Sequence, residues 1–89
     1  MTRVENNIFV ARPEILASGQ WTVLYVIHPL SLDAISRVAN NRGFDPQEDG
    51  DRLKFLGLLN PNLSLPEANK LAIELNDAAT EIAKEKGLL

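Results

Sequence analysis

The densest group of side chains that could do chemistry lies between residues 45 and 51, where four acids stand close together. With Asp45 as position one, Asp49 and Gly50 fall where a calcium-binding loop needs an oxygen ligand and its glycine. Position twelve is Leu56, where such a loop requires a bidentate carboxylate. We therefore expect no metal site here, and the stretch predicts a solvated loop whose acids precede a helix.

The single histidine, His28, follows an apolar run and precedes Pro29. At the end of a strand it would lie where α/β folds often place catalytic groups. The sequence has neither a G-x-S-x-G motif nor a glycine-rich phosphate loop to accompany it. We therefore expect no enzyme activity, and we expect His28 to cap the strand or to bond to a neighbouring carbonyl. A small-ligand pocket near His28, between sheet and helices, is an alternative that no motif supports.

The composition excludes further classes of site. There is no cysteine, which removes disulfides, cysteine nucleophiles and thiolate metal sites. The 89 residues predict one small domain over 1–89, with a modest core that a dimer would enlarge. The longest apolar run, residues 21–27, is far shorter than the ~20 residues of a membrane helix, and the amino terminus lacks a signal-peptide pattern. We expect a cytoplasmic protein with no membrane partner and no cofactor.

The elements that must position these groups begin with that apolar run. Six of the seven residues in 21–27 are apolar, and the run does not alternate with polar residues. This pattern predicts an inner strand that is covered on both faces. Residues 7–11 predict a second short strand, and residues 13–17 predict a single helical turn. One helix over 13–27 is the alternative, which Gly19 and the β-branched residues disfavour.

A first helix is predicted over 32–42, with Ser31 as its N-cap and Gly43 as a left-handed C-cap. Its predicted core face consists of Leu32, Ile35, Val38 and Ala39. A second helix is favoured over 46–59, although two glycines weaken it by about 1 kcal/mol each. The alternative for 52–59 is a strand.

A third helix is the best-defined element of the sequence. Ser64 and Glu67 form a capping box, Pro66 lies in the first turn, and Gly87 follows the last turn. Apolar residues recur at spacings of three and four, at Ala68, Leu71, Leu75, Ala78 and Ile82. We expect this stripe to pack on its own domain. Because it is rich in alanine, a helix of a partner could also approach it closely.

The first two predicted helices, 32–42 and 46–59, have the outline of a helix-turn-helix. In that motif the second helix enters the major groove with its amino end first. Here that end carries Glu48, Asp49 and Asp51, and phosphates repel carboxylates. Nucleic-acid binding is therefore an alternative that the charge disfavours.

Together these patterns predict an α+β fold, with a small amino-terminal sheet followed by about three helices, and an all-α bundle is the alternative. An apolar strand with so few candidate neighbours needs a ladder partner, so we expect a homodimer or an obligate protein partner. The expected function is that of a small protein-interaction module: a regulatory subunit, an adaptor or an inhibitor. Its candidate interface residues are Trp21, Tyr25, Leu71, Leu75 and Ile82.

Overall fold

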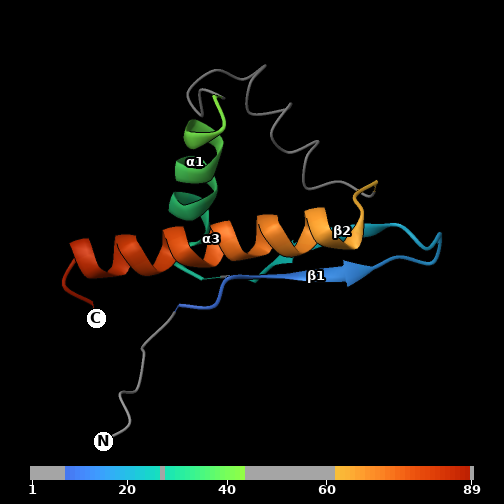
Figure 1. Ribbon diagram of the computed structural model, residues 1–89. Coiled ribbons are helices and arrows are strands. Elements are labelled where there is room, and N and C mark those ends of the chain that lie inside the picture. Colours follow the sequence, from blue (N-terminus) through green and yellow to red (C-terminus); the bar gives the residue numbers. More distant parts are fainter. Residues whose placement is uncertain (1–7, 27, 44–61, 89) are drawn as a thin grey trace, which may run out of the picture.

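A β-hairpin and two helices make up residues 8–26, 28–43 and 62–88, the part of the chain that the computed structural model describes (Figure 1). Strands β1 (Ala11–Ile15) and β2 (Trp21–Tyr25) pair antiparallel. Helix α1 (Ser31–Asn41) follows, and helix α3 (Leu65–Glu85) ends the described chain. The predicted α+β class with an amino-terminal sheet is confirmed. Where about three helices were expected, the described residues hold two, and segment 46–59 lies outside them.

The hairpin begins later than the sequence predicts. The pairing runs from Ala11 opposite Tyr25 to Ile15 opposite Trp21. The helical turn predicted over 13–17 is therefore wrong, as are the single helix over 13–27 and the all-α bundle. Pro13, which favoured a turn, lies in the edge strand β1, where a missing N–H is tolerated. Gly19 lies in the connecting turn with a φ of 87°, a conformation that glycine adopts without strain.

The hydrogen bonds of the hairpin show which backbone groups of β1 point outwards. The Val26 N–H donates to the Val10 carbonyl, and the Leu16 N–H donates to the Gln20 carbonyl. Antiparallel ladders alternate, so the even-numbered residues bond across the hairpin. The odd-numbered residues of β1, which include Ala11 and Pro13, direct their backbone groups to the outer edge.

Side chains of α3 satisfy this outer edge where the chain enters β1. The N–H groups of Val10 and Ala11 donate to Asn76 Oδ1 at 2.7 and 2.9 Å, and Asn76 Nδ2 donates to the Ala11 carbonyl at 3.0 Å. One turn later, Thr80 Oγ1 accepts the Ile8 N–H at 2.9 Å and donates to the Asn76 carbonyl at 3.0 Å. We call Asn76 and Thr80 the edge clasp. Its hydrogen bonds replace those of a third strand.

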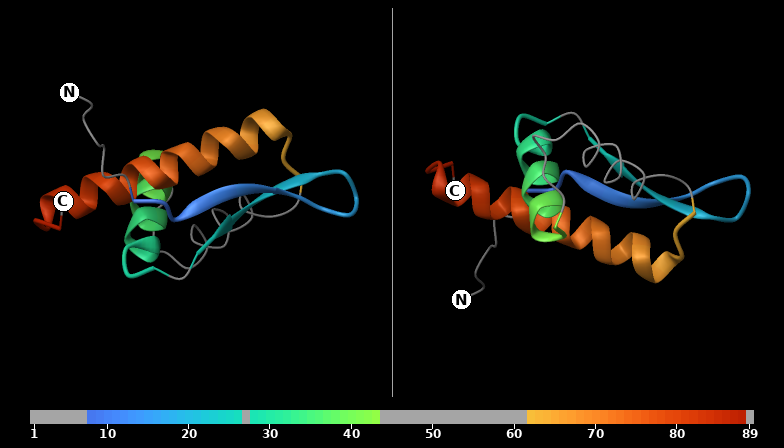
Figure 2. Two further views of the ribbon diagram at one scale, coloured as in Figure 1. Left: turned by 90° about the horizontal axis from the view of Figure 1, so that it is seen from below. Right: turned by 90° about the horizontal axis from the view of Figure 1, so that it is seen from above.

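The predicted apolar stripe of α3 is confirmed as the centre of the core. Its five residues are buried, together with Ala72, Ala79 and Ala83. Opposite them the hairpin contributes Val10, Ala11 and Val23, and α1 contributes Ala34, Val38 and Ala39. Figure 2 shows α3 lying alongside the hairpin and α1 crossing α3. The alanines allow this close approach, so the stripe packs on its own chain.

The start and the buried face of α1 differ from the prediction. The N-cap is Leu30, without a side-chain cap, and Ser31 is the first helical residue because its Oγ donates to the Val26 carbonyl at 2.7 Å. Leu32 is 71% exposed, so its assignment to the core is wrong. Two residues along a helix turn by about 200°, which places Leu32 opposite the buried Ala34. The left-handed Gly43 that ends α1 is confirmed, with a φ of 87°.

Ion pairs follow the crossing of the two helices. Arg37 donates to both carboxylate oxygens of Glu85 at 2.6 and 2.9 Å, and Arg42 donates to those of Glu74 at 3.1 and 2.8 Å. Lys86 lies 3.1 Å from a carboxylate oxygen of Asp33. The hydrogen bond from Arg37 lowers the pKa of Glu85 and raises that of Arg37. These pairs are solvent-exposed, so they orient α1 more than they stabilise it.

The capping box at the start of α3 is confirmed. The Glu67 N–H donates to Ser64 Oγ at 3.3 Å, and the Ser64 N–H donates to Glu67 Oε1 at 3.1 Å. Hydrogen bonds from the Ser64 hydroxyl and the Ser64 amide lower the pKa of Glu67. The predicted start of this helix and the Gly87 that follows it, with a φ of 74°, are both present.

The substitution Asn76→Ala tests the edge clasp. It leaves the N–H groups of Val10 and Ala11 without their acceptor in a part-buried position, so we expect the free energy of unfolding to fall by about 2–4 kcal/mol. Urea denaturation measures this change. The matched control is Asp77→Ala, one residue along on the exposed side of the helix. Equal effects of the two substitutions would contradict the role of the clasp.

Acid is expected to remove the contribution of the Arg37–Glu85 pair. The pKa of Glu85 in the folded chain lies below its ordinary value of 4.5, so the pair stabilises the fold above that pH and loses its effect as the pH falls through the lower folded value. The melting temperature of Glu85→Gln should therefore lie below that of wild type at neutral pH and approach it in acid. Asp77→Asn is the control. A gap that persisted in strong acid would contradict this assignment.

Candidate interaction surface

The structure divides the five predicted interface residues into two groups. Leu71, Leu75 and Ile82 are 2%, 0% and 5% exposed, inside the core of the chain itself. A partner cannot reach them in this fold. Trp21 is half-buried and packs against that core, whereas Tyr25 is 49% exposed. Of the five, Tyr25 is the one with a largely accessible side chain.

Tyr25 lies in a run of exposed apolar residues at the end of β2. Leu24 and Val26, its neighbours on either side, are 43% and 40% exposed. Successive side chains of a strand point to opposite faces, so this run presents apolar groups on both faces. We call Leu24, Tyr25 and Val26 the β2 patch. The strand predicted over 21–27 is confirmed for Trp21–Tyr25, but the expectation that both of its faces are covered is wrong at this end.

The outer edge of β2 is occupied at its beginning. The Trp21 N–H donates to the Leu63 carbonyl, and the Leu63 N–H donates to the Trp21 carbonyl, each at 3.0 Å. By the same alternation, Val23 and Tyr25 direct their backbone groups outwards. Within the described ranges, no hydrogen bond is found for these outward groups. Val23 is only 4% exposed, so the accessible part of β2 begins at Leu24.

The two edges of the hairpin differ in this respect. On β1, the edge clasp satisfies Ala11, and Pro13 has no N–H to offer at the next outward position. Proline and covering side chains are two of the ways in which proteins protect a strand edge from pairing. On β2, Val23 is buried, whereas Tyr25, the next outward residue, is 49% exposed.

The β2 patch is electrically neutral. No residue between Trp21 and Val26 is charged. Arg12, which is paired with Leu24 across the hairpin, lies 3.5 Å from the carboxylate of Glu14. The charges nearest to the patch on β1 therefore compensate one another, and a partner of either sign meets no strong repulsion there.

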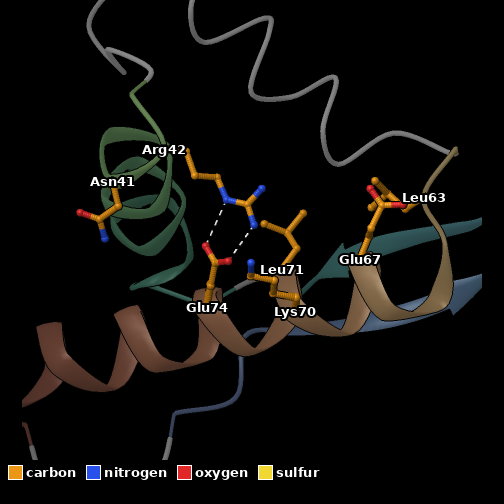
Figure 3. A pocket seen from close by; sticks show the side chains of 7 residues that line it. All are labelled: Asn41, Arg42, Leu63, Glu67, Lys70, Leu71 and Glu74. Atoms are coloured by element: carbon orange, nitrogen blue, oxygen red, sulfur yellow. Dashed lines mark hydrogen bonds and ion pairs between the residues drawn. The ribbon is translucent and has the colours of Figure 1, made fainter.

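A groove of about 530 Å³ lies between the end of α1 and the first half of α3 (Figure 3). Most of its charged groups are already satisfied: Arg42 binds Glu74, and Glu67 binds Ser64. Lys70 is the cation in this lining for which the described part of the chain offers no partner. The full lining consists of Asn41, Arg42, Leu63, Glu67, Lys70, Leu71 and Glu74. The groove does not include His28.

His28 has a structural contact in the turn before α1. Its Nδ1 accepts the Leu30 N–H at 3.0 Å, and its carbonyl accepts the Ser31 N–H at 3.0 Å. The ring therefore bonds to a backbone N–H rather than to the carbonyl that we expected. Because its Nδ1 and its carbonyl both accept backbone N–H groups, His28 fixes the turn that leads into α1.

Several predicted features cannot be located. The acidic stretch 45–51 and the second helix of the helix-turn-helix outline lie outside the described residues. In residues 8–26, 28–43 and 62–88, no three His, Cys, Asp or Glu side chains gather to hold a metal ion. None of the helices in these ranges combines the length and the apolar character that crossing a membrane requires. Comparisons with protein-family models, curated proteins and solved structures gave no match.

Two substitutions at His28 test its role in the turn. His28→Ala removes the acceptor of the buried Leu30 N–H, so the free energy of unfolding should fall by about 1–3 kcal/mol. His28→Asn should retain most of the stability, because an asparagine side chain accepts from the N–H two residues on in the same way. Urea denaturation of both variants provides the measurement, and equal losses would contradict this role.

Proposed function

We propose that this chain is a small protein-interaction domain that docks a partner on the β2 patch. The observation that carries the proposal is the contrast between the two edges of the hairpin. The clasp and Pro13 protect the first part of the β1 edge, whereas Leu24, Tyr25 and Val26 at the end of β2 are three consecutive exposed apolar residues. Exposed apolar groups around an unpaired strand edge favour association with another chain.

The arrangement supports docking by strand addition. An extended segment beside the exposed end of β2 would bond to the outward backbone groups of Tyr25, and main-chain hydrogen bonds supply the affinity in this mode. Its side chains would cover Leu24 on one face and Tyr25 on the other, which supplies selectivity. A domain that acts in this way serves as a regulatory subunit, an adaptor or an inhibitor of the chain that it binds.

Charges placed on the β2 patch test the proposal. We expect Leu24→Lys and Tyr25→Lys to lose the proteins that the wild-type chain retains from a native lysate, because a lysine at a strand edge opposes pairing. Quantitative mass spectrometry of the retained proteins provides the measurement.

The control is Ile73→Lys, which places the same charge on an exposed apolar position of α3, outside the β2 patch. Thermal unfolding should show that all three variants remain folded. The proposal is overturned if the control loses the same proteins as the patch variants, or if the patch variants retain what wild type retains.

A further inference from the structure

We draw no further inference here: the strongest candidate, the β2 patch at the exposed end of the hairpin, belongs to the site already described, and nothing in the described residues shows what covers it.

Discussion

The arrangement of the described residues depends on how the outward backbone groups of strand β1 find hydrogen-bond partners. Two strands leave two rows of outward backbone groups, and an isolated hairpin is marginal in water. Asn76 resolves this for β1 by accepting two N–H groups and returning one donor to the Ala11 carbonyl. A primary amide can play this part because it carries both an acceptor and donors. Together with Thr80, it fixes α3 along β1 and brings the alanine-rich stripe over the hairpin.

The position of α1 is then set from both of its ends. Ser31 joins its start to the end of β2 through the Val26 carbonyl. The ion pairs of Arg37 with Glu85 and of Arg42 with Glu74 align it across α3. Exposed ion pairs contribute little free energy, but the bidentate geometry restricts the crossing. Buried Ala34 and Val38 supply the packing that holds it there.

Local signals allowed part of this structure to be predicted from the sequence. The capping box of Ser64 and the apolar stripe lie within one element, so the start of α3 and its buried face could be identified correctly. Features that depend on distant residues could not. In the sequence Ser31 resembles an N-cap, but in the structure its hydroxyl donates to the Val26 carbonyl. Pro13 resembles a turn residue, but in the structure it lies in β1, where its missing N–H falls on the outer edge. Asn76 gave no signal beyond a polar position beside the stripe, because the residues that it binds lie 65 and 66 positions earlier.

The candidate interface shows the same limit. An apolar stripe has the same sequence pattern whether it meets its own hairpin or a partner, so Leu71 and Leu75 were natural candidates until their burial assigned them to the core. The run 21–27 is divided in a similar way. Val23 is covered within the chain, whereas Leu24, Tyr25 and Val26 are not. α3 and Leu63 cover the first part of the run. The apolar side chains that stay exposed lie beside outward backbone groups that have no partner among the described residues. Apolar side chains and open ladder groups therefore coincide at one end of one strand, which is the combination that strand addition requires.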